Sequence, residues 1–149
     1  MLAPKRTKYR KVQKIRSIRG KALRGAKLVN GEYGLRACEP AKITANQIEA
    51  VRVTLSRYTK KTGKVYTDIF PDIPVTIKPA GTRMGSGKGN PEYFVAIVKP
   101  GRVMFEMAGL PEETCKEALK KAMQKLPIKC SIISKDEQNA NEGGKSNEI

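Results

Sequence analysis

The chain has 149 residues, and its 30 Lys and Arg against 14 Asp and Glu give a formal net charge of +16. This length suits one domain with a modest core, and nothing in the composition indicates a second domain. The positive charge far exceeds what solubility requires, so it indicates a polyanionic partner, above all nucleic acid. An anionic membrane surface is the competing partner and is disfavoured, because the apolar runs are too short to span a bilayer and the basic N-terminus lacks an amphipathic apolar face.

The cysteines and the absence of histidine argue against a catalytic or metal site. Three cysteines stand far apart, at Cys38, Cys115 and Cys130. This odd number and wide spacing support neither a disulfide framework nor a zinc site. Without histidine, most acid–base and metal chemistry lacks its usual side chain. We therefore expect no catalytic residue, no metal and no cofactor, and the charged start of the chain predicts no signal peptide.

Residues 1–27 predict a basic, extended N-terminal arm. Between Lys5 and Lys27 there are eleven positive charges and no acid. Such a segment repels itself and has little to bury, so it is either a solvated disordered arm or one that follows RNA phosphates. Tyr9 adds a ring on which a base could stack. The candidate rRNA-binding residues of the arm are Lys5, Arg6, Lys8, Tyr9, Arg10, Lys11, Lys14, Arg16, Arg19, Lys21 and Arg24.

A strand and a helix follow the arm. Residues 28–38 predict a first strand or bent hairpin. Thr44 and Gln47 have the spacing of a capping box, which predicts a helix from there to about Lys61. Apolar residues at helical spacing mark its buried side. The opposite side of this helix carries four polar or basic residues, which fit a solvated surface and an RNA-facing surface equally well. They are Arg52, Ser56, Arg57 and Lys60.

The remaining elements complete an α+β pattern. Further strands are predicted at 64–70, 75–77, 93–99, 102–107 and 128–133, and the third and fourth of these flank a type II turn at Pro100-Gly101, which predicts a hairpin. A second helix begins near Pro111, where acids complement the helix dipole, and ends before Pro127. Residues 28–135 thus predict a two-layer domain, with two helices packed on a mixed or antiparallel sheet. Residues 136–149 predict a disordered acidic tail.

A glycine-rich basic loop at residues 78–90 separates two predicted strands. A Walker-type phosphate loop would need glycine at position 82 and Ser or Thr at position 89, but the chain has Thr82 and Gly89 there. A dinucleotide-binding loop would need glycine at position 90, where the chain has Asn90. Nucleotide binding therefore fails on spacing, which leaves a flexible exposed loop or a contact with an anionic partner. The candidate rRNA- or tRNA-proximal residues are Lys78, Arg83, Met84, Gly85, Gly87, Lys88 and Gly89.

Six segments in unbroken order resemble the universal large-subunit ribosomal protein sixteen family of bacteria and organelles. They are Met1–Lys11, Ile43–Ala50, Ile69–Asp72, Arg83–Asn90, Val98–Met107 and Lys125–Lys129. The resemblance extends to about Ile133. Asp68 departs from it, because the family usually has a basic residue there, and a phosphate contact at this position is therefore not expected.

The resemblance implies a structural, non-enzymatic protein of the large ribosomal subunit. It implies binding to 23S-type rRNA near the A-site tRNA and the peptidyl-transferase region, with P-site tRNA and neighbouring large-subunit proteins as further partners. The arm and the loop would reach toward the tRNA passage. The expected location is the cytoplasmic ribosome of a bacterium, with the plastid ribosome as the alternative. Rival hypotheses are a free-standing RNA-binding regulator and a small phosphate-handling enzyme.

Overall fold

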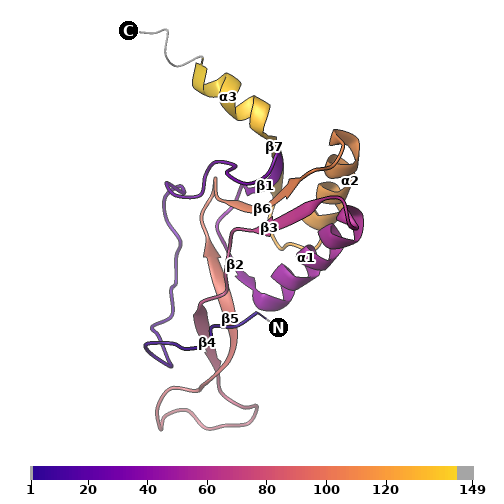
Figure 1. The fold of residues 1–149 in the computed structure, drawn as a ribbon. Helices are drawn as coiled ribbons and strands as arrows, with labels where there is room; N and C mark the ends of the chain where they lie inside the picture. The colour runs from indigo at the N-terminus through magenta and orange to yellow at the C-terminus, as the bar shows by residue number, and fades with distance from the viewer. Residues whose placement is uncertain (1, 144–149) are drawn as a thin grey trace, which may run out of the picture.

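Seven strands and three helices make up the part of the chain that the computed structural model describes, residues 2–143 (Figure 1). In order they are β1 (Tyr33–Ala37), β2 (Ala41–Thr44), α1 (Ala45–Thr59), β3 (Lys64–Thr67), β4 (Ile73–Ile77), β5 (Asn90–Val98), β6 (Val103–Ala108), α2 (Glu112–Met123), β7 (Cys130–Ser134) and α3 (Lys135–Gly143). The predicted α+β class is confirmed.

The strands are divided between two antiparallel sheets. One has the order β3-β6-β1-β7 and the other β2-β5-β4. The hairpin predicted around Pro100-Gly101 is wrong in its pairing, because β5 pairs with β2 and β4, whereas β6 pairs with β1 and β3. The turn itself exists, with Gly101 at a φ of +91°. It sends β6 to β1 because Ala37 exchanges backbone hydrogen bonds of 2.8 and 2.9 Å with Gly101 and Arg102.

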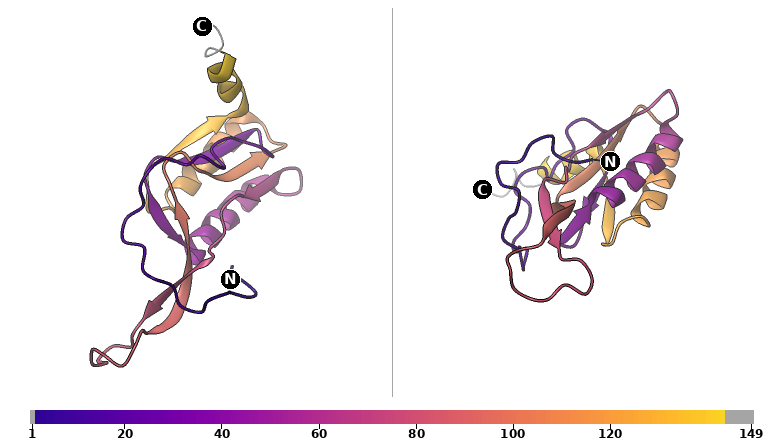
Figure 2. Two further views of the ribbon diagram at one scale, coloured as in Figure 1. Left: turned by 90° about the vertical axis from the view of Figure 1, so that its left-hand side faces the viewer. Right: turned by 90° about the horizontal axis from the view of Figure 1, so that it is seen from below.

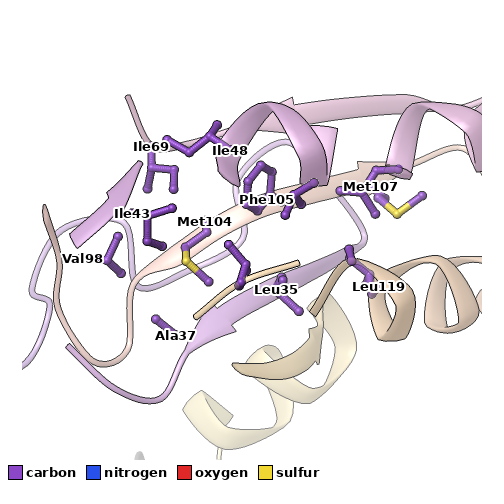
Figure 3. Packing of buried hydrophobic residues seen from close by; sticks show 14 of the residues in the cluster. Leu35, Ala37, Ile43, Ile48, Ile69, Val98, Met104, Phe105, Met107 and Leu119 are labelled. Atoms are coloured by element: carbon purple, nitrogen blue, oxygen red, sulfur yellow. The ribbon is translucent and has the colours of Figure 1, made fainter. Parts of the chain in front are cut away.

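Helices α1 and α2 lie side by side and bury their apolar faces against the sheets (Figures 1 and 2). The predicted capping box is confirmed, because the Gln47 N–H donates to Thr44 Oγ1 and the Thr44 N–H donates to Gln47 Oε1. Ile48, Val51 and Leu55 are fully buried, as their spacing predicts. Figure 3 shows the core between the layers, where Phe105 of β6 lies among residues of α1, α2 and β1.

The last helix occupies the first part of the segment predicted as a disordered tail, residues 136–149. Residues 135–143 form α3, in which the Glu137 N–H donates to Ser134 Oγ over 3.3 Å and two acids stand in the first turn. The helix is also attached to the domain, since the Lys135 N–H donates to the Glu32 carbonyl and Gln138 Oε1 accepts from the Leu28 N–H. These contacts hold a polar segment that composition alone assigns to disorder. The rest of the predicted tail, residues 144–149, lies outside the described residues.

Candidate RNA interface

The basic arm has no helix or strand of its own between residues 2 and 32. From about residue 10 it runs along the side of the domain away from α1 and α2 (Figures 1 and 2). The core holds it at its far end, where the Ala22 N–H donates to the Pro100 carbonyl and the Val103 N–H donates to the Gly25 carbonyl. The Arg102 guanidinium adds a bond of 3.1 Å to the Arg24 carbonyl. The arm is therefore extended but attached.

The glycine loop is the tip of the β4–β5 hairpin and projects away from the body of the domain (Figures 1 and 2). Residues 79–88 are exposed, and the apolar Met84 side chain is 91% exposed. Gly85 and Gly87 have φ angles of +98° and +95°, which side-chain-bearing residues rarely adopt. The Lys78 ammonium donates to the Gly85 carbonyl over 2.6 Å, across the loop. Glycine is thus needed here for backbone conformation.

The arm and the loop meet. The Lys11 ammonium donates to the Lys88 carbonyl over 2.9 Å, and the Lys88 ammonium donates to the Val12 carbonyl over 2.5 Å. Two basic segments that are more than 70 residues apart in sequence therefore form one surface, which we call the arm–loop surface. Its members are the candidate residues of the arm and of the loop. Within the described residues none of their cationic groups forms an ion pair, so the charge remains available to a polyanion.

Three further basic residues join this surface without having been singled out from the sequence. The Lys42 ammonium, on β2, donates to the Ile15 carbonyl of the arm. Lys99 and Arg102 line a concavity of about 400 Å³ together with Lys21 and Arg24. All three stand inside or beside strands, where single lysines and arginines form no local pattern. Only the path of the arm over the sheets brings them into the site.

A family model described as Ribosomal protein L16p/L10e matches residues 4–133. The chain belongs to this family. It is similar to the large ribosomal subunit protein uL16 of Heliobacterium modesticaldum, with 57% identity over 99% of both chains. It is also similar to the protein of that name from Agathobacter rectalis, with 58% identity over the same shares.

Membership of the L16p/L10e family makes this a ribosomal protein and not an enzyme. The matched range contains the arm from Pro4, the loop and both sheets, and it ends one residue before β7 does. Helix α3 therefore lies outside the family match. Within the described residues there is no group of three or more His, Cys, Asp or Glu side chains that could hold a metal ion, and no helix is long and apolar enough to cross a membrane.

The candidate residues of α1 lie apart from the arm–loop surface of this L16p/L10e protein. Arg52, Ser56, Arg57 and Lys60 are exposed, but α1 lies on the side opposite to the loop and to the arm from about residue 10, and only the start of the arm comes near the first turns of α1 (Figures 1 and 2). The Arg52 guanidinium pairs with the carboxylate of Glu49, at 2.9 Å between Nε and Oε2. The structure therefore does not bring this helix surface together with the arm and the loop, and its role in RNA binding stays a prediction.

Asp68, the acid at a usually basic position of the family, has its carboxyl group turned inward. Its Oδ2 is buried without a hydrogen-bond partner, and its backbone carbonyl accepts a bond of 2.9 Å from the Arg102 guanidinium. Burial and the neighbouring carboxyl of Glu106 raise the pKa of Asp68 to about 7, against a smaller opposing effect of Arg102. The side chain thus points inward, and its raised pKa leaves it only partly ionised near neutral pH, so it contributes little negative charge to the arm–loop surface.

This inward acid predicts an unusual pH dependence of stability. Between about pH 4 and pH 7 the folded protein holds a proton on Asp68 that the unfolded chain has lost, so the free energy of unfolding falls as pH rises. Because the group is half-exposed, we expect a loss of about 1–2 kcal/mol, less than the full shift would give. Urea unfolding at pH 5 and pH 8 should show this loss in the wild type and not in Asp68→Asn. Asp72→Asn, which changes an exposed acid nearby in the sequence, should show the same loss as the wild type. If Asp68→Asn loses as much stability between pH 5 and pH 8 as the wild type does, Asp68 is not the group responsible.

Proposed function

We propose that this protein is a structural constituent of the large ribosomal subunit that binds 23S-type rRNA through its arm–loop surface. The observation that carries the proposal is the meeting of the two basic segments through Lys11, Val12 and Lys88. A single surface without acids can follow a phosphate backbone farther than either segment alone. Membership of a ribosomal protein family and two relatives with a large-subunit name support the same function.

The finer placement concerns the tip of the loop. The loop projects from the domain, so it can reach past the bound rRNA while the arm and the sheets remain on it (Figure 1). We place it toward the A-site tRNA and the peptidyl-transferase region, with P-site tRNA and neighbouring large-subunit proteins as further partners. The arrangement supplies positioning and positive charge, and the reaction belongs to the rRNA. The bacterial relatives favour the cytoplasmic ribosome of a bacterium over a plastid ribosome.

Binding of the purified protein to large-subunit rRNA at increasing salt concentration tests the main proposal. Each phosphate contact should lower the logarithmic slope of affinity against salt by about 0.7–0.9, so the affinity should fall steeply. Co-sedimentation with large subunits at physiological salt separates a ribosomal constituent from a free-standing RNA-binding regulator. Recovery of the protein free of ribosomes under those conditions would reject the proposal.

Removing one positive charge at the tip of the loop should affect function more than folding. Arg83 is exposed, and its surroundings in the loop offer nothing to pack against, so Arg83→Ala should change stability by less than about 0.5 kcal/mol. We expect the same variant to weaken A-site tRNA binding to large subunits reconstituted with it, measured by filter retention. Lys61→Ala removes one charge from an exposed position beyond α1 and serves as the control. Equal losses of melting temperature and tRNA binding in Arg83→Ala would contradict this role.

A further inference from the structure

The outer face of the three-stranded sheet is unusually apolar. Its inner positions, among them Ile43 and Val98, are fully buried in the core, as expected. An antiparallel sheet with one solvated face normally carries polar residues at the alternate positions. Here the alternate positions of β4 and β5 carry Ile73, Val75 and Ile97 instead, and β2 adds the polar Lys42 and Thr44. The three-stranded sheet therefore has apolar side chains on both faces, and its outer face must be shielded from water by another part of the chain or by a partner.

The arm covers only part of this face. Its residues 12–15 lie across the sheet and enclose, with β4 and β5, a groove of about 430 Å³. At the end of the groove nearest the glycine loop, two large side chains remain open to solvent. Ile77 is 47% exposed and Tyr93 is 39% exposed. A volume of this size is typical of sites that hold a small organic group.

The rim of the groove is basic. Lys14, Lys42 and Lys88 line it, and no acid does so among the residues that the structure describes there. Lys42 and Lys88 each use one ammonium N–H to hold an arm carbonyl, at Ile15 and Val12 respectively. An ammonium group has three donors, so each retains capacity for a second acceptor. The groove thus offers an apolar floor with an exposed ring and a rim of unneutralised positive charge.

We propose that this groove binds one unpaired nucleotide of RNA, with its base against Tyr93 and Ile77 and its phosphate at the lysine rim. Proteins recognise unstacked bases in this way, by stacking them on aromatic rings and holding the backbone with cations. An apolar protein segment fits the floor but gives the lysine rim nothing to bind. The inference rests on the proposed function, because it takes RNA to be the partner, and it specifies that part of the RNA is single-stranded.

The full-length protein should distinguish a single-stranded RNA oligonucleotide from a blunt-ended, fully paired RNA duplex with the same number of phosphates. Tyr93→Ala should lower the affinity for the single strand about tenfold, the loss typical of removing one base–aromatic stack, and change the affinity for the duplex less than about twofold. Tyr93→Phe retains the ring and should bind both as the wild type does. Phe70→Ala removes an aromatic ring that is 48% exposed and does not line the groove, so it is the matched control and should also leave both affinities unchanged.

A second measurement needs no variant. Photo-cross-linking of an RNA strand containing 4-thiouridine to the wild type should label Tyr93 or Ile77, and labelling confined to other segments would overturn the inference. Equal losses of affinity for the single strand and the duplex in Tyr93→Ala, or no loss for either, would also overturn it. If Tyr93→Ala binds both RNAs normally but is incorporated poorly into large subunits, the groove binds a protein segment and not a nucleotide. If the wild type binds neither RNA, the proposed function fails as well, whereas salt-dependent binding that is independent of Tyr93 leaves the proposed function intact.

Discussion

Deletion of residues 2–24 should abolish most of the affinity for rRNA while the α+β domain still folds. The deleted segment holds ten of the eleven positive charges between Lys5 and Lys27. If each met one phosphate, the logarithmic salt slope of binding would fall by about 7–9, which is a loss of several orders of magnitude at low salt. Incorporation into large subunits should be lost with it. Affinity measured by filter binding at several salt concentrations provides the test.

The domain should survive this deletion because the arm gives little to the main core, although loss of residues 12–15 exposes more of the outer face of the three-stranded sheet. The buried apolar residues begin at Leu28, and of the deleted segment Leu2 packs against the main cluster. Thermal unfolding should therefore show a cooperative transition at a slightly lower temperature. A full-length variant with the ten arm charges replaced by Gln separates the effect of charge from that of chain length. A truncated chain that fails to fold without RNA would show that arm and domain are not separable.

Glu106→Gln should be the most damaging conservative change in the domain. The Glu106 carboxylate is 1% exposed and accepts three backbone N–H groups, from Val29 at 3.0 Å, Asn30 at 2.7 Å and Gly31 at 2.5 Å. An amide has only one acceptor oxygen, so its NH₂ group would face backbone donors. Loss of charged, buried hydrogen bonds of this kind should cost about 3 kcal/mol and lower the melting temperature by about 10 °C.

The measurement is best made at pH 5. There the Asp68 carboxyl, whose pKa is about 7, is protonated, so removing the charge of Glu106 relieves no repulsion between the two acids. Glu117→Gln removes an exposed carboxylate that pairs with Lys121 on α2, and should leave the melting temperature almost unchanged because solvent screens exposed ion pairs. If the two variants unfold at the same temperature, the buried carboxylate does not fix the segment at residues 29–31.

Local signals predict much of the fold. The capping box at Thr44 and the apolar spacing of α1 predict the helix and its buried side, because both depend on residues within one or two turns. The division into two sheets depends on partners far away in sequence. The turn at Pro100-Gly101 has the residues of a tight connection, but the bonds of Ala37 to residues 101 and 102 decide that β5 and β6 separate. The sequence does not predict the third helix, because the polar composition of residues 136–149 is typical of disorder and the Ser134–Glu137 cap is a weak local signal.

In the site, too, features within one segment are predictable from the sequence, whereas contacts between distant segments are not. Charge and glycine content find the arm and the loop separately, since each is a continuous segment. Their meeting depends on lysine ammonium groups bonded to backbone carbonyls, at Lys11 and Lys88. Any residue supplies a carbonyl, so no sequence pattern marks the acceptor. The same is true of the bond from Lys42 to Ile15, which adds a residue of β2 to the site.

The hydrogen bonds of the backbone N–H groups of residues 28–31 also determine when, during synthesis, the arm becomes attached to the domain. Their acceptors are Gln138, 110 residues after Leu28, and Glu106, which lies 75–77 residues after the other three. At synthesis rates of about 5–20 residues per second, Gln138 follows Leu28 by roughly 5–20 s. Until Glu106 has been made, the new arm has its charge but no fixed exit from the domain. Three of the four bonds can form after that point, and the fourth forms only after Gln138 has been made.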